Sequence, residues 1–239
     1  MVFCRFDRGS VQKSARIFVR ILFFTFALFF ASSGYAQEHF VGITGGSGIS
    51  NITGNHPVNN PENRTFLQGG VSYAFHFARF AHIEADLMYT SRGYNIKMLH
   101  TDDVGALTGE TTISSWQFSY LALPVKVGLH FGNKLLFFLN TGVVSSRLLH
   151  AAYDFPGIED LMPSQSVNLT EYVRTFDFAG LVEAGVSIPL SNALFITTHV
   201  SYAHSFTSHT TPDHYAHRYL YHYGLSGNLG LKYRFGRGN

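Results

Sequence analysis

The sequence predicts an all-β fold, a transmembrane antiparallel up-and-down β-barrel of eight strands with short periplasmic turns and long outer loops. Three observations predict this fold class. The 239-residue chain is 46% hydrophobic but only 13% charged, about half the charge of soluble domains. It has no run of eighteen apolar residues, which excludes a bundle of transmembrane helices. Apolar and polar residues alternate along several segments rich in Gly, Phe and Tyr, as is typical of membrane β-barrels.

The first 36 residues are typical of a cleaved secretory signal peptide. Five basic residues lead into an apolar segment at 21–31, and small residues at Gly34 and Ala36 follow it. The apolar segment is too short to span a bilayer comfortably, although an N-terminal anchor is the alternative. Cleavage after Ala36 would leave 37–239 as a single barrel and remove Cys4, the only cysteine. The remaining chain would be slightly acidic, so we expect no nucleic-acid partner and no cofactor.

Segments with a period of two residues define the expected strands. The long connections between them are expected at 51–63, 98–112, 150–171 and 207–218, and the short ones at 78–80, 132–133 and 190–192. Outer-membrane barrels have this alternation, with short turns in the periplasm and long loops outside. The expected strands are 39–50, 64–77, 81–97, 113–131, 134–148, 172–189, 193–206 and 219–235.

The last of these segments shows the alternation most clearly. Its odd positions are almost all aromatic or aliphatic, and its even positions are mostly small or polar. A β-sandwich is the alternative, but its strands rarely continue for so long. Aromatic residues at both ends match the two interfacial girdles of a membrane barrel. The expected interfacial aromatics of this segment are Tyr219, Tyr221, Tyr233 and Phe235.

The same alternation assigns polar and charged residues to the barrel interior. An eight-stranded barrel is just wide enough to be filled by its own side chains. Buried charges are tolerated only when they are paired, so we expect acids and bases to pair in a plugged lumen. A narrow porin-like channel is the alternative. The expected lumen-facing polar network consists of Glu84, Asp86, Lys126, Asp177, Glu183, His199, Ser201, Lys232 and Arg234.

Three aromatic residues, Trp116, Phe118 and Tyr120, share the inward register of Lys126. We expect a β-bulge near Tyr120 to turn them outward, which would make Trp116 an interfacial aromatic as well.

Four short motifs follow one another along the chain: FVGITGG at 40–46, ADLMY at 85–89, YLALP at 120–124 and GLKYRF at 230–235. Together they resemble the PorT-like outer-membrane β-barrel family of Gram-negative bacteria, and the resemblance spans the chain after residue 36. It implies a small porin-like barrel in the outer membrane; the family's namesake takes part in assembling a secretion and gliding apparatus. Ala122 stands where the family has an acidic residue, and the namesake's aromatic-rich opening is missing. The resemblance therefore implies fold and location more firmly than role.

Ser201, His199 and Glu183 are the sharpest candidates for catalysis. His199 and Ser201 share one strand face, and a turn near Ser191 would place Glu183 opposite His199. Such a Ser-His-Glu relay would suit an outer-membrane lipid-modifying hydrolase. However, the alternation points all three residues into the lumen, and no oxyanion donor is identifiable. A lumenal hydrogen-bond network is the favoured interpretation, and we expect no catalytic residue.

Two outer loops carry the remaining functional potential. His209, His214 and His217 near the last loop are weak metal-ligand candidates, but a solvated loop is favoured because their spacing matches no standard site. Residues 150–171 are more apolar than a plain connector and could cap the barrel or recognise a protein or surface ligand. We expect a monomeric, non-enzymatic protein that contacts outer-membrane lipid and lipopolysaccharide. Its expected role is in envelope structure, surface interaction or envelope assembly.

Overall fold

The computed structural model describes residues 38–55, 61–101, 104–157, 163–210 and 219–235. The predicted signal peptide and the histidines at 214 and 217 lie outside these residues. No helix in the described part is long and apolar enough to cross a membrane. A short 3₁₀ helix, η1, spans Thr170–Tyr172. The described strands are β1 (Glu38–Gly54), β2 (Pro61–Ala78), β3 (Ala81–Thr101), β4 (Leu107–Phe131), β5 (Leu136–Phe155), β6 (Gln165–Asn168), β7 (Phe176–Pro189), β8 (Leu194–Ser205) and β9 (Leu220–Phe235).

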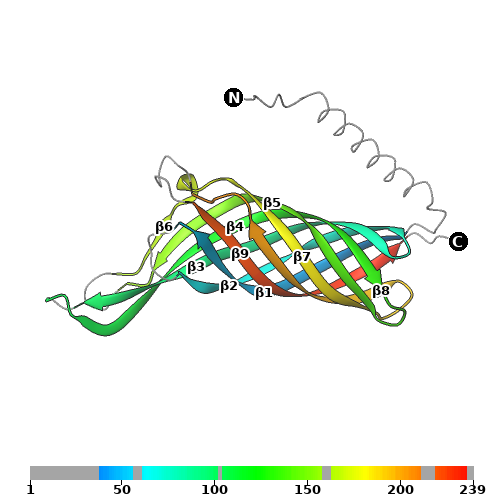
Figure 1. Cartoon of the computed structure of the whole chain (residues 1–239), viewed down its shortest axis with the longest axis horizontal. Coiled ribbons are helices and arrows are strands. Elements are labelled where there is room, and N and C mark those ends of the chain that lie inside the picture. Colours follow the sequence, from blue (N-terminus) through cyan, green and yellow to red (C-terminus); the bar gives the residue numbers. More distant parts are fainter. Residues whose placement is uncertain (1–37, 56–60, 102–103, 158–162, 211–218, 236–239) are drawn as a thin grey trace, which may run out of the picture.

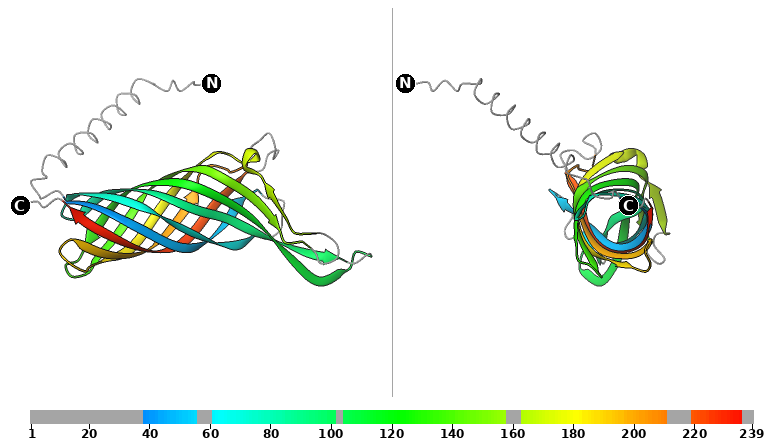
Figure 2. Two further views of the ribbon diagram at one scale, coloured as in Figure 1. Left: turned by 180° about the vertical axis from the view of Figure 1, so that it is seen from behind. Right: turned by 90° about the vertical axis from the view of Figure 1, so that its right-hand side faces the viewer.

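Eight of these strands form a closed antiparallel ring. Each strand pairs with its neighbour in the chain, and β1 closes the ring on β9 from His39↔Phe235 to Gly54↔Leu220. The end-on view in Figure 2 shows the ring, and Figure 1 shows the tilt of its strands. The remaining strand, β6, pairs only with β5 and lies outside the ring. Closure leaves no unpaired edge, which a sheet in lipid requires, and the predicted fold class is confirmed.

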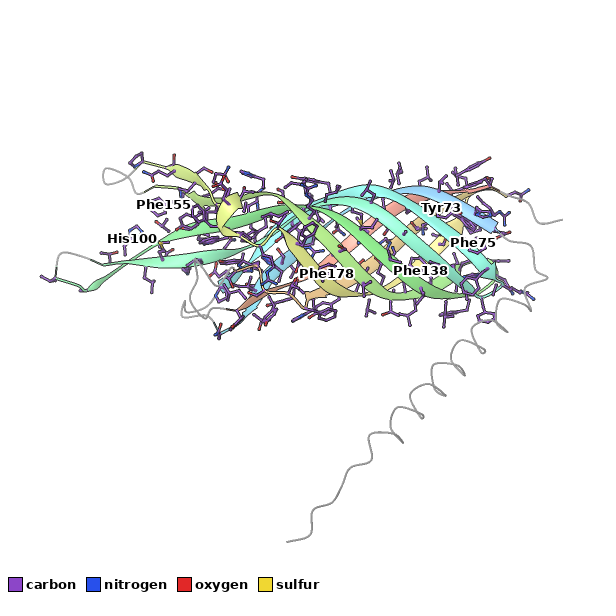
Figure 3. All side chains as sticks on the ribbon, turned by 90° about the horizontal axis from the view of Figure 1, so that it is seen from above. Tyr73, Phe75, His100, Phe138, Phe155 and Phe178 are labelled. Carbon is purple, nitrogen blue, oxygen red and sulfur yellow. The ribbon has the colours of Figure 1, made fainter. Side chains whose placement is uncertain are left out.

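Side chains alternate between the outer surface and the lumen, as the period of two residues predicts. The outer surface carries aliphatic and aromatic side chains; Leu67 is 71% exposed and Leu229 67%. Tyr73 and Phe178 lie on this surface too (Figure 3). Inward positions on the same strands hold small, polar and charged residues, most of them buried. The lipid-facing band is therefore apolar and the interior polar, the reverse of a soluble protein.

The two ends of the barrel differ in their connections. The connections β2–β3, β4–β5 and β7–β8 are short and lie at one end, where β1 begins and β9 ends (Figure 1). The long connections lie at the other end, which faces outward in an outer-membrane barrel. There β3 and β4 continue past the other strands as a projecting hairpin, paired as far as Thr101↔Leu107. The loop expected at 98–112 is thus mostly strand, because β3 and β4 stay paired beyond the lipid, where neither face has to be apolar.

The expectation that a bulge turns Trp116, Phe118 and Tyr120 outward is wrong. Phe118 and Tyr120 are 0% and 1% exposed, and the Trp116 ring stacks on Tyr94 with a centroid distance of 5.8 Å. The irregularity does exist, since Ser119 pairs with His150 and Tyr120 with Leu148. The extra residue, however, belongs to β5. The β4 strand therefore keeps its alternation, and its aromatic residues fill the outer mouth of the barrel.

Candidate functional site

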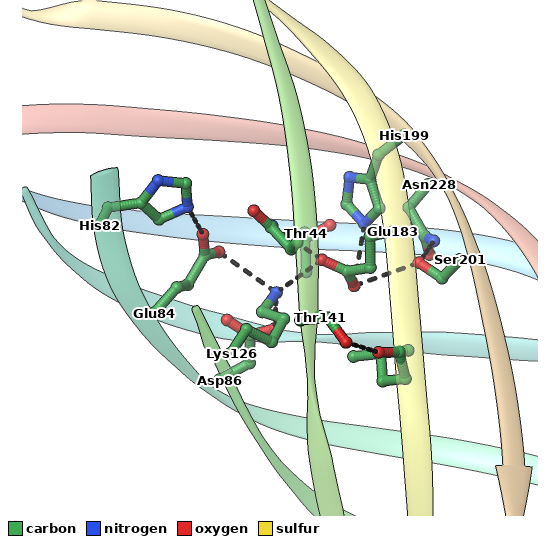
Figure 4. A network of polar contacts seen from close by, with 12 residues as sticks. Thr44, His82, Glu84, Asp86, Lys126, Thr141, Glu183, His199, Ser201 and Asn228 are labelled. Carbon is green, nitrogen blue, oxygen red and sulfur yellow. Dashed lines mark hydrogen bonds and ion pairs between the residues drawn. The ribbon is translucent and has the colours of Figure 1, made fainter. Parts of the chain in front are cut away.

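The centre of the lumen is organised around one buried lysine. Lys126 of β4 is 2% exposed. Its Nζ lies 2.7 Å from Asp86 Oδ2 and 3.0 Å from Glu183 Oε2, and 3.4 Å from Glu84 Oε1. The ammonium group thus donates toward carboxylates from β3 and β7 at once (Figure 4). Paired in this way, the charges are tolerated in an interior that excludes water.

A second lysine, on β9, binds one of the same three carboxylates. Lys232 of β9 places its Nζ 2.7 Å from both carboxylate oxygens of Glu84. Asn140 of β5 donates from Nδ2 to Glu183 Oε2 at 3.1 Å. Three carboxylates and two ammonium groups therefore share the centre of the barrel, and their hydrogen bonds join six of the eight ring strands. This network crosses the lumen at mid-height.

Ser201, His199 and Glu183 do meet, but not in the order of a catalytic relay. Ser201 Oγ donates directly to Glu183 Oε1 at 3.2 Å, and His199 Nε2 lies 3.8 Å from the same oxygen. Within the described part of the chain, Ser201 makes no hydrogen bond to His199; instead Asn228 Nδ2 donates to Ser201 Oγ at 3.3 Å. A relay needs the imidazole between serine and carboxylate. Here the carboxylate lies between them and is already paired with Lys126.

Separate polar contacts lie toward the two mouths. In the outer half, Asp177 accepts hydrogen bonds from Ser205 Oγ at 2.8 Å and Thr207 Oγ1 at 2.7 Å. Arg92 lies 3.9 Å from the same carboxylate. At the short-turn mouth, Arg234 NH1 donates to Glu38 Oε1 at 2.9 Å. The expected lumen residues thus occupy three layers rather than a single network.

The outer mouth is filled by an apolar cluster. Tyr94, Phe118 and Tyr120 pack there with residues of β1, β5 and β9. His209 is 5% exposed, and its ring lies 4.5 Å from that of His222. His209 is therefore packed inside the mouth rather than held in a solvated loop.

Sequence reasoning missed a group of three histidines at the other end of the lumen. His76, His82 and His130 each offer one ring nitrogen, and these atoms lie within 4.8 Å of one another. The alternation gives His82 and His130 inward positions. His76 is the only histidine of the expected strand 64–77, so nothing in that strand pointed to a cluster. The short turn between β2 and β3 could have revealed the cluster, because a hairpin with this turn pairs His76 with His82.

Over residues 35–211 the chain matches the family described as outer membrane protein beta-barrel domain. The chain belongs to this family. It is an integral outer-membrane β-barrel protein. The closed ring and its apolar outer face are the features that such a protein needs in lipid. Comparison with the curated proteins gives no match.

Solved structures similar to this outer-membrane barrel include three from different bacteria. A major outer membrane protein from Thermus thermophilus has a TM-score of 0.47 at 12% identity, covering 83% of this chain and 99% of that one. OprG from Pseudomonas aeruginosa has a TM-score of 0.45 at 10% identity, covering 84% and 97%. Neisserial surface protein A has a TM-score of 0.44 at 10% identity, covering 82% and 97%.

Proposed function

We propose that this outer-membrane barrel is a non-enzymatic envelope protein with a plugged lumen, which acts in envelope structure or through contacts at the cell surface. The observation that carries the proposal is the position of Lys126, which is 2% exposed and lies among three carboxylates at the centre of the barrel. Opening a path for solutes would separate these charges in a medium of low dielectric, which is costly. The proposal therefore favours a plug over a narrow channel.

The projecting β3–β4 hairpin supports a role in surface contacts. Leu99, Val104 and Ile113 are 60%, 87% and 48% exposed on it. Apolar side chains beyond the lipid are typical of surfaces that bind a partner. We infer that the partner is a protein or another surface ligand, that the barrel is a monomer, and that its belt contacts outer-membrane lipid and lipopolysaccharide. An accessory part in envelope assembly, the role of the namesake of the PorT-like family that the sequence resembles, is one form of this role.

The proposal that the protein is not an enzyme depends on the order of the groups around Glu183. Ser201 faces a carboxylate that is shared with Lys126, so no neutral imidazole is placed to take its proton. The group is also enclosed by the barrel wall and away from the lipid on which a lipid-modifying hydrolase would act. A hydrogen-bonded plug accounts for the same residues.

Two measurements on purified protein test the plug. Reconstituted in planar bilayers, the wild-type barrel is expected to give no steady conductance, while cold and boiled samples differ in electrophoretic mobility because the closed sheet resists detergent. Steady channels from the wild type would overturn the plugged lumen. Loss of a lipid A acyl chain that depends on Ser201 would overturn the non-enzymatic assignment.

A complementation experiment separates structural from surface roles. A deletion strain receives either the wild-type gene or a variant in which residues 98–112 are replaced by a two-residue turn. This turn joins the paired residues Lys97 and Ile113, so it removes only the projecting ends of β3 and β4. If contacts at the surface are the main role, only the wild type restores adhesion to cells or matrix, and both restore detergent resistance. If neither function depends on the gene, the proposed role is wrong.

A further inference from the structure

Three histidines converge on the inside of the barrel near its short-turn end. His76 of β2 and His82 of β3 are directly paired across the β2–β3 hairpin. His130 lies on β4, the next strand, two residues from Gly128, which pairs with His82. All three occupy inward positions, and their ring centroids are 4.7 to 5.7 Å apart. Hairpin register and barrel closure thus bring three imidazoles to one point.

The nitrogen atoms of this cluster suit a transition metal. One ring nitrogen from each histidine lies within 4.8 Å of the other two. Zinc–nitrogen bonds of about 2.0–2.1 Å bring tetrahedral ligands to separations of about 3.4 Å, so the rings would have to move inward by roughly 1 Å. A cavity of about 50 Å³, lined by all three histidines, gives them that room. Imidazole is a preferred ligand of Zn²⁺, Cu²⁺ and Ni²⁺.

Two of the rings have buried nitrogens without partners. Within the described residues, Nδ1 of His82 and Nδ1 of His130 are buried and make no hydrogen bond. A buried polar atom without a partner costs free energy, and in native structures it calls for a ligand, a water or an ion. The opposite nitrogen of His82, Nε2, lies 3.7 Å from Glu84 Oε2. This separation is an electrostatic contact rather than a hydrogen bond, and it lies on the Nε2 side of the ring, so Nδ1 is left for a metal.

The backbone beside the cluster leaves space for it. A Cβ atom at Gly128 would lie 2.6 Å from His82 Nε2 and would also overlap the Asn140 amide oxygen. Only glycine at this position allows the His82 ring to lie against β4. The His82 imidazole therefore occupies the space that a side chain at position 128 would fill.

The cluster is also accessible from the short-turn mouth. An open vestibule of about 610 Å³ lies there, and His76 and His130 line both it and the smaller cavity. Glu38 and Arg234 are at its rim and pair with each other. An ion could therefore reach the cluster from the periplasm without crossing the ion-paired centre of the lumen.

We propose that His76, His82 and His130 bind one divalent transition-metal ion, with Zn²⁺ as the ion to be tested first. The site lies on the periplasmic side of the ion pairs around Lys126. Three imidazoles supply the protein ligands, and the fourth position faces the cavity. Lys232, which lines the same cavity, is held by both oxygens of Glu84. This assignment stands independently of the proposed surface role.

The first test uses wild-type protein alone, without a histidine tag, refolded in detergent. Competition with a chromogenic chelator is expected to show one Zn²⁺ per chain, and Co²⁺ in its place is expected to give the visible absorption of a tetrahedral site. X-ray absorption of the Zn²⁺ form should show three imidazole ligands, recognised by scattering from their ring atoms, and one further oxygen or nitrogen ligand. Failure to bind either ion, or a shell without three imidazoles, overturns the proposal.

The second test locates the ion. His82→Gln and His130→Gln are each expected to weaken Zn²⁺ binding more than about 100-fold, since the loss of an outer-shell partner alone costs about 10- to 100-fold. The matched control is His209→Gln/His214→Gln/His217→Gln, which removes the three histidines that the sequence offered as weak metal ligands and should bind as the wild type does. Cold and boiled mobility confirms folding of every variant used. Binding that survives at the cluster variants and is lost in the control places the ion in the last loop and overturns the proposal.

Discussion

Lys126 of β4 reaches Glu183 of β7 across the lumen, with Nζ 3.0 Å from Oε2, although β5 lies between the two strands. The contact joins positions 57 residues apart in sequence. It exists because the curvature of the ring brings inward-facing side chains of next-but-one strands together.

Replacing Lys126 should destabilise the barrel strongly. The change Lys126→Met leaves Asp86 and Glu183 buried without their shared cation, at an expected cost of about 3–5 kcal/mol in free energy of unfolding. Urea unfolding in lipid vesicles, followed by the fluorescence of Trp116, measures the loss. Lys134→Met, at an exposed turn position, is the matched control and should change little. Equal stabilities for the two variants would show that the central pairs are not needed.

Gly128→Ala tests how tightly the wall packs against the lumen. Its added Cβ would collide with the Asn140 amide oxygen and the His82 ring, so we expect a loss of about 1–3 kcal/mol. Gly227→Ala is the control, because nothing lies within 4 Å of the Cβ that it would add. The same unfolding assay applies. A Gly128→Ala variant as stable as the Gly227→Ala variant would mean that the interior tolerates a methyl group there.

Trp116 should be shielded from lipid. It is the only tryptophan, and it stacks on Tyr94 and Phe118 at the mouth. Brominated lipid is therefore expected to quench its fluorescence weakly. In the comparison variant Trp116→Phe/Tyr219→Trp, the indole moves to an exposed position of the outer surface, and quenching should be strong. Strong quenching of Trp116 itself would restore the interfacial position that the sequence suggested.

The orientation of the barrel can be read by cysteine labelling, since Cys4 lies in the predicted signal peptide. A membrane-impermeant maleimide should label Val104→Cys, near the tip of the β3–β4 hairpin, on intact cells. Asn133→Cys, in the β4–β5 turn at the opposite end, should react only after the outer membrane is permeabilised. The reverse pattern would mean that the long loops face the periplasm.

Much of the fold follows from the sequence because alternation is a local property of each strand. It places Leu87 on the lipid face and Glu84 in the lumen whatever the rest of the chain does. The strand ends were less predictable, because pairing beyond the lipid no longer requires apolar residues on one face. The β3–β4 hairpin therefore lacks the signal that marks the membrane-spanning part.

The sequence by itself determined the number of strands in the ring, the alternation of the two faces and most of the polar residues that enter the lumen. Only the tertiary structure decided which of them meet. Lys126 pairs with Glu183, and His76 joins His82 and His130, because the stagger between neighbouring strands sets the height of each side chain in the closed barrel. Likewise the extra residue near Tyr120 lies on β5, which keeps Phe118 inside. Stagger and bulge placement are properties of strand pairs, and a single strand's pattern does not contain them.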